Sequence, residues 1–338
     1  MQKTIRSRTV LIKRWGGVLA GVIGAVGLGW YVMRYSSELY RLREISIWGI
    51  LLLSTIVLIG HLGVALKLRR MVDAFNVRLS LWEAFLLTEA GGFLNIVPLY
   101  LGTGFRAIYL KKIRKLEFAD FSMGFLGALL SEFMSAGLLG ILFYSMISYT
   151  FSTLYIVFIA YMLVPLALLT IAWIFKRSDR FLTFTRSKTR TLGWFGRLLR
   201  SLASGLDTVL SHPEVVFHWF LLNILTGLVL GTRYWLIGAW LGYSIDFASG
   251  MVLQSASRAV AVVTIMPSGT IGLREALTGL GAMGLGVPAA IGVMISTIDR
   301  IVATAWIVFL GSISLFILRN RIARAGLSDI ATEPEVAV

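Results

Sequence analysis

The sequence contains no cysteine, and Asp, Glu, Lys and Arg together make up only 14% of its 338 residues. The absence of cysteine excludes a disulfide framework and a Cys-ligated metal. There is no G-x-x-x-x-G-K-[ST] phosphate loop and no dinucleotide-binding fingerprint, so we expect no cofactor and no ATP hydrolysis by this chain alone. The three histidines, His61, His212 and His218, lack metal-ligand spacing and predict no metal site.

Apolar residues dominate what is present. The chain is 57% hydrophobic, and residues 15–33, 45–66 and 133–175 contain no Asp, Glu, Lys or Arg. A helix needs about 20 apolar residues to cross a bilayer. The pattern therefore predicts an all-α polytopic membrane protein with six full spans. We place these spans at 16–33, 45–66, 121–148, 152–175, 215–241 and 289–318.

Two further apolar segments, 82–110 and 249–287, are interrupted. In each, a proline is followed by glycines and then by a charged residue. The arms of the first segment, about 16 and 12 residues, are shorter than the roughly 20 needed to span, which predicts a re-entrant hairpin. The second segment is either re-entrant or two full spans, which would give eight crossings. We expect the chain to break at Pro98, Gly102 and Gly104, and at Pro267, Gly269 and Gly272.

A proline and a charged residue recur at the same offset in the two halves of the chain. Pro98 and Pro267 are 169 positions apart, and so are Arg106 and Glu275. This regularity predicts a duplicated unit, with repeat cores at about 81–148 and 248–318 inside one membrane domain, 1–326. Broken apolar helices in corresponding positions of two halves indicate the binding site of a transporter.

The distribution of Lys and Arg predicts the topology. If each interrupted segment enters and leaves on the same side of the membrane, five connections share one side and hold 24 of the 32 Lys and Arg: 1–15, 67–81, 111–120, 176–214 and 319–338. The positive-inside rule then places them, and both termini, in the cytoplasm. The halves become an inverted repeat in the cytoplasmic (inner) membrane, and the net charge of +15 needs no nucleic-acid partner. We also expect an amphipathic helix within the basic loop 176–214 and a disordered tail at 327–338.

Ionised side chains in the apolar segments are candidates for function. Each costs about 2.5–3.5 kcal/mol or more at the centre of a membrane helix if it faces lipid, so we expect them to cluster inside the protein. An arginine can hold two phosphate oxygens at once; the alternative role is an internal salt bridge. For the acids, the alternatives are proton coupling, recognition of a headgroup amine, or partnership with those arginines. The predicted substrate-binding residues are Glu89, Asn95, Arg106, Glu132, Arg258, Arg274, Glu275, Asp299 and Arg300; Arg233 is a weaker candidate, and Asn95 is better suited to shaping the break than to contacting substrate.

The motifs resemble a known family. Asn95-x-x-Pro98 leading to Arg106, and Pro267-x-Gly269-x-x-Gly272-x-x-Glu275 followed by Asp299-Arg300, are similar to the flippase-like membrane domain of lysylphosphatidylglycerol synthases. The resemblance covers roughly residues 15–320. It implies movement of aminoacylated or glycosylated lipids between leaflets, with aminoacyl transfer belonging to a separate cytosolic domain. This sequence lacks that domain, so we do not expect synthase activity.

Three functions fit these patterns. The first is a lipid translocase or lipid-binding transporter, without enzymatic activity, that moves an anionic or phosphate-linked headgroup between leaflets. The second is a membrane-embedded transferase or hydrolase acting on lipid-phosphate-linked sugars, with Glu132 or Asp299 as general base. The third is a noncatalytic membrane partner of a soluble transferase, bound through the basic loop 176–214.

Overall fold

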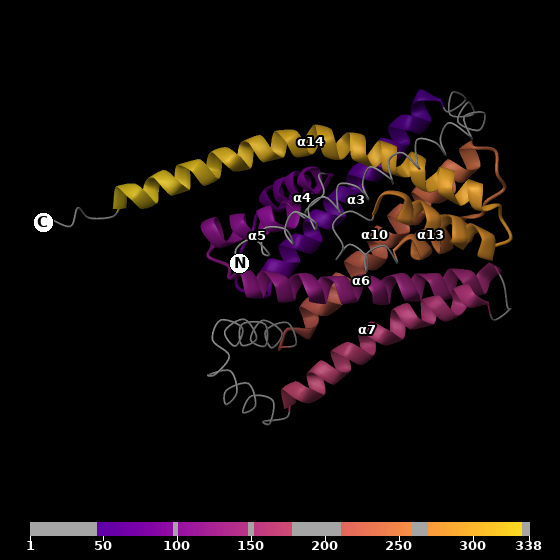
Figure 1. The fold of residues 1–338 in the computed structure, drawn as a ribbon, viewed down its shortest axis with the longest axis horizontal. Coiled ribbons are helices and arrows are strands. Elements are labelled where there is room, and N and C mark those ends of the chain that lie inside the picture. Colours follow the sequence, from indigo (N-terminus) through magenta and orange to yellow (C-terminus); the bar gives the residue numbers. More distant parts are fainter. Residues whose placement is uncertain (1–45, 97–100, 148–151, 178–210, 259–269, 333–338) are drawn as a thin grey trace, which may run out of the picture.

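The computed structural model describes residues 46–96, 101–147, 152–177, 211–258 and 270–332 (Figure 1). This part of the chain is helical and contains no strand, which confirms the all-α prediction. The helices are α3 (Ile47–Asp73), α4 (Leu81–Ile96), α5 (Leu101–Arg114), α6 (Phe118–Ile147), α7 (Thr153–Arg177), α10 (Pro213–Trp240), α11 (Phe247–Ser257), α13 (Thr270–Gly284) and α14 (Ala289–Thr332).

Five of these helices are long and apolar enough to cross a membrane: α3, α6, α7, α10 and α14. They coincide with five of the six predicted full spans; the sixth, at 16–33, lies outside the described residues. Large apolar side chains stay exposed on the spans, for example Met146 and Phe316, each 67% exposed. Such exposure suits a lipid environment and not water. The chain is therefore a polytopic helical membrane protein.

Both interrupted segments consist of two short helices that pack against each other, α4 with α5 and α11 with α13. Residues 97–100 and 259–269, which connect the two helices of each pair, lie outside the described residues, and Pro98, Pro267 and Gly269 are among them. The four helices have 16, 14, 11 and 15 residues. At 1.5 Å per residue each is at most about 24 Å long, which is short of the roughly 30 Å hydrocarbon core. Re-entrance of either hairpin stays a prediction.

The described helices give the same order twice, a long helix, a broken pair and another long helix: α3, α4, α5, α6 and α10, α11, α13, α14. The halves interlock, because α4 packs on α14, α11 packs on α6, and α3 packs on α10. In Figure 1, α4 and α5 lie toward one end of the bundle and α13 toward the other. This arrangement is compatible with an inverted repeat, which stays a prediction.

Two further predictions concern the C-terminal tail and the basic loop 176–214. The tail is not disordered from residue 327, because α14 continues to Thr332; residues 333–338 lie outside the described part. The helix continues because no proline or glycine interrupts the sequence between Leu327 and Thr332. The amphipathic helix predicted in the basic loop 176–214 also lies outside the described residues.

Candidate functional site: an intramembrane cavity and its ion pairs

A cavity of about 350 Å³ lies where α6, α10, α11 and α13 meet. Its lining combines apolar and ionised side chains: Phe125, Leu129, Leu230, Ser257, Glu132, Arg258 and Arg274. Glu132 and Arg258 form an ion pair across the boundary between the two halves, with exposed side-chain fractions of 25% and 13%. Three residues predicted from sequence to bind substrate therefore share one cavity.

Lys67 joins this cluster although the sequence analysis assigned it to a cytoplasmic loop. Its Nζ donates to Asn223 Oδ1 at 2.8 Å, and the amide of Asn223 lies 3.4 Å from Ser131 Oγ. Lys67 is also within electrostatic range of Glu132 and Arg258. The prediction was wrong because it ended the span at the first charged residue, whereas α3 continues to Asp73.

Asp299 holds two arginines beside the cavity. Its side chain is fully buried and pairs with Arg233 of α10 and, at 3.0 Å, with Arg274 of α13. Arg274 also donates to Tyr234 Oη at 2.9 Å. Since Arg274 lines the cavity and contacts Asp299, it links the cavity to the buried carboxylate. Arg233, only a weaker candidate in the sequence, is 6% exposed and is integral to this network.

Glu275 and Arg300 form a second pair on α13 and α14. Arg300 Nη1 donates to Glu275 Oε1 at 2.9 Å, and the backbone N–H of Gly272 donates to Glu275 Oε2 at 2.8 Å. Gly272 has φ +89°, a conformation that glycine adopts without strain. Glu275 thus fixes the first turn of α13. These contacts match the salt-bridge alternative for Glu275 and Arg300.

The first hairpin uses its predicted site residues differently. Asn95 Oδ1 accepts a hydrogen bond from the Gly102 N–H at 3.0 Å, so Asn95 joins α4 to α5 across the break. Arg106 donates from Nε to the carbonyl of Leu87 at 3.2 Å and from Nη2 to that of Thr88 at 3.0 Å. Within the described parts of the chain, Arg106 has no ion pair and does not line the cavity.

Glu89 is likewise outside the cavity. Its Oε2 lies 3.1 Å from His61 Nδ1, and the side chains are 2% and 13% exposed. Arg106 is within electrostatic range of Glu89. Sequence reasoning found no ligand spacing around His61 and missed this contact, because it depends on how α3 packs on α4.

Glu83 is a further buried acid that the sequence did not identify as a site residue. It accepts hydrogen bonds from Tyr109 Oη at 2.9 Å and from Arg114 Nε at 3.1 Å. Its backbone N–H donates to Ser80 Oγ at 3.1 Å, so Ser80 caps the start of α4. The only signal available in the sequence was a lone acid at the beginning of an apolar segment.

The fold and these charges define a class: a polytopic helical membrane protein with two broken helical pairs and paired ionised groups inside the bundle. The chain belongs to the family described as the lysylphosphatidylglycerol synthase TM region, whose model matches residues 17–311. The match confirms the predicted family. Comparisons with curated proteins and with solved structures find no match.

Proposed function

We propose that the protein is a lipid translocase that moves an anionic or phosphate-linked headgroup between the leaflets of the cytoplasmic membrane, with both termini in the cytoplasm. The observation that carries this proposal is the cavity lined by Glu132, Arg258 and Arg274 together with apolar side chains. A polar headgroup can enter such a cavity while the acyl or prenyl tails remain in the bilayer. Family membership supports a role connected with membrane lipids.

The charge balance around the cavity favours an anion. The charged residues at and beside the cavity comprise four cations and two carboxylates, which leaves two positive charges. Each charge without a counterion at depth costs about 2.5–3.5 kcal/mol or more, and a bound phosphate offsets that cost. The six residues are Lys67, Arg233, Arg258 and Arg274, with Glu132 and Asp299.

Arg274 is the best-placed residue to exchange partners with a headgroup. It is 24% exposed on the side chain, whereas its partner Asp299 is fully buried and keeps Arg233 when Arg274 moves. A phosphate in the cavity can therefore accept hydrogen bonds from the Arg274 guanidinium while Asp299 stays paired with Arg233. We expect Arg258 to act similarly, because its partner Glu132 retains the electrostatic interaction with Lys67.

We also propose that the protein is not an enzyme. A general base must be free to accept a proton from a reacting group. Glu132 is paired with Arg258, and Asp299 lies between two guanidinium groups, so the observed contacts leave neither carboxylate free to accept that proton. The geometry therefore supports transport better than transfer or hydrolysis.

A flip assay tests the proposal. Purified protein is reconstituted into vesicles containing fluorescent phosphatidylglycerol or, separately, fluorescent phosphatidylcholine, and dithionite quenching reports exchange between leaflets. We expect faster exchange of phosphatidylglycerol, lowered about tenfold or more in Arg274→Lys, which keeps the charge but loses the planar two-point contact. The control Lys112→Gln changes an exposed lysine at the end of α5. Equal exchange of both lipids, or unchanged rates in folded Arg274→Lys, would count against the proposal.

A further inference from the structure

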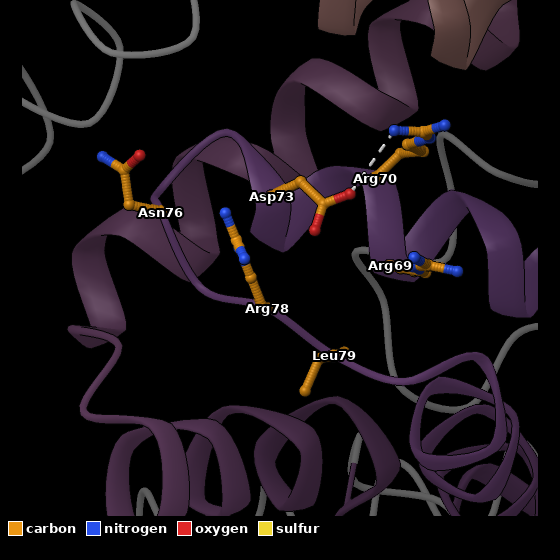
Figure 2. Close-up of a pocket in the computed structure, with 6 residues that line it drawn as sticks. All are labelled: Arg69, Arg70, Asp73, Asn76, Arg78 and Leu79. Carbon is orange, nitrogen blue, oxygen red and sulfur yellow. Dashed lines mark ion pairs between the residues drawn. The ribbon is translucent and has the colours of Figure 1, made fainter.

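A second charged pocket lies at the end of α3 and shares no lining residue with the cavity described above. It measures about 690 Å³ and is lined by Arg69, Arg70, Asp73, Asn76, Arg78 and Leu79 (Figure 2). These residues belong to the last turns of α3 and to the connection that leads to α4. The charge distribution of the chain predicts that this end faces the cytoplasm.

The frame of this pocket is fixed by backbone contacts and buried side chains. The Val77 N–H donates to the Val72 carbonyl at 3.2 Å, which folds the connection back on the helix end. Asn76 takes a left-handed conformation, φ 58°, which asparagine tolerates better than most residues. Leu79 is 3% exposed and packs in the same core cluster as Val72. The arginines are thus presented by an anchored turn.

Three arginines and a single carboxylate line the pocket, which leaves a net charge of +2. Asp73 contacts Arg70 at 3.6 Å, on an exposed surface where such a pair contributes little. Arg69 Nε is buried without a hydrogen-bond partner among the described residues, and Arg78 has no ion pair with them. Figure 2 shows Arg78 extending between Asn76 and Asp73, with Arg70 on the other side of Asp73.

The end of a helix attracts cations by itself, so this alternative has to be weighed. The macrodipole supplies about half a negative charge at the C-terminus of α3. That is too little to balance a net +2, and Arg78 lies outside the helix. The pocket therefore remains positively charged after the partial negative charge of the helix end is counted, and this charge can attract an anion.

The surroundings favour a lipid as the source of that anion. Leu62 and Val64, on α3, are 43% and 38% exposed and belong to the apolar surface of a membrane span. Arg69 follows Val64 by five residues, or about 7.5 Å along the helix, so acyl chains along α3 would bring their headgroup to the arginines. Basic pockets at the cytoplasmic side of membrane helices bind anionic headgroups.

We propose that this pocket binds the phosphate group of an anionic lipid at the membrane surface. The guanidinium groups of Arg69 and Arg78 donate charge-assisted hydrogen bonds to the phosphate oxygens, and Arg70 adds to them when it leaves Asp73. The site is separate from the intramembrane cavity and does not depend on transport.

Native mass spectrometry of the purified full chain tests the site. The protein in detergent is titrated with phosphatidylglycerol and with phosphatidylcholine of the same acyl chains. We expect phosphatidylglycerol to be retained in preference to phosphatidylcholine, and the apparent affinity of one bound phosphatidylglycerol to fall roughly tenfold in Arg69→Gln/Arg78→Gln. The control is Lys111→Gln/Lys112→Gln, which removes the same number of positive charges from exposed side chains at the end of α5 and should leave that affinity unchanged.

The outcomes separate the alternatives. Equal losses in the arginine and lysine variants, or no preference for phosphatidylglycerol in the unaltered protein, would overturn the site. Inorganic phosphate is added in a further arm; displacement of the lipid by millimolar phosphate, with the same arginine dependence, would overturn the lipid as its natural ligand. If the double arginine variant does not fold, Arg78→Gln alone decides, because Arg78 is exposed and makes no ion pair with the described residues. A normal flip rate in a variant that no longer binds lipid at this pocket would show that the pocket is separate from the proposed translocation.

Discussion

The contact between the two arms of the first hairpin gives the sharpest test of the fold. Gly102 of α5 is buried and donates to Asn95 on α4. A Cβ at position 102 would lie 2.6 Å from Asn95 Oδ1 and still closer to the Gly91 carbonyl oxygen, which is backbone and cannot move aside. Gly104, two residues later in the same helix, is exposed and has no such neighbour within 4 Å.

We therefore expect Gly102→Ala and Gly104→Ala to have opposite effects. Overpacking costs about 1–3 kcal/mol, and loss of the Asn95 hydrogen bond adds about 0.5–1.5 kcal/mol. Better helix propensity returns about 0.5–1 kcal/mol. The net change is a destabilisation of about 1–3 kcal/mol for Gly102→Ala and a stabilisation of up to about 1 kcal/mol for Gly104→Ala.

Thermal unfolding of the two variants in the same detergent, followed by size-exclusion chromatography after heating, measures this difference. We expect Gly102→Ala to lose its monodisperse peak several degrees below the unaltered protein, and Gly104→Ala to lose it at the same temperature or above. Equal melting temperatures for the two variants would refute the close packing of α4 on α5.

Two further changes test the buried charges. Asp299→Asn leaves Arg233 and Arg274 without a carboxylate at depth, and breaking such a buried network costs about 3–5 kcal/mol, so we expect a large fall in melting temperature; Asp73→Asn, which alters an exposed pair, should change it little. Glu83→Gln keeps the shape of the side chain but removes the charge that Arg114 and Tyr109 contact, and we expect a loss of about 1–3 kcal/mol in the same assay. A melting temperature equal to that of the unaltered protein in either buried variant would contradict the ion-pair assignments.

Features of the fold that depend on local sequence were predictable. Long stretches dominated by apolar residues located the five described spans, because a charged side chain that faces lipid is costly. The interruption of the apolar segment 82–110 predicted two short helices, and the structure has α4 and α5 there; the role of Pro98 itself stays a prediction. The same cost of charge at depth indicated that the arginines and acids would pair, as Glu132 does with Arg258.

The choice of partner was not predictable from sequence, because it depends on contacts between helices that are far apart in the chain. Arg106, the foremost candidate for phosphate binding, lies against α4 and donates to two carbonyls instead. Lys67 entered the cluster because α3 extends past the first charge and its side chain reaches Asn223 on α10. Charge and spacing do not determine such distances; the packing of α3, α4 and α10 does.

The Glu132–Arg258 pair connects α6 of the first half to α11 of the second. Drawing these helices apart would strip each ion of its counterpart in a medium of low dielectric, at a cost of several kcal/mol. The pair therefore ties the two halves of the chain together. Under the proposed function, a headgroup phosphate that takes the place of the carboxylate beside Arg258 would lower the cost of separating α6 from α11.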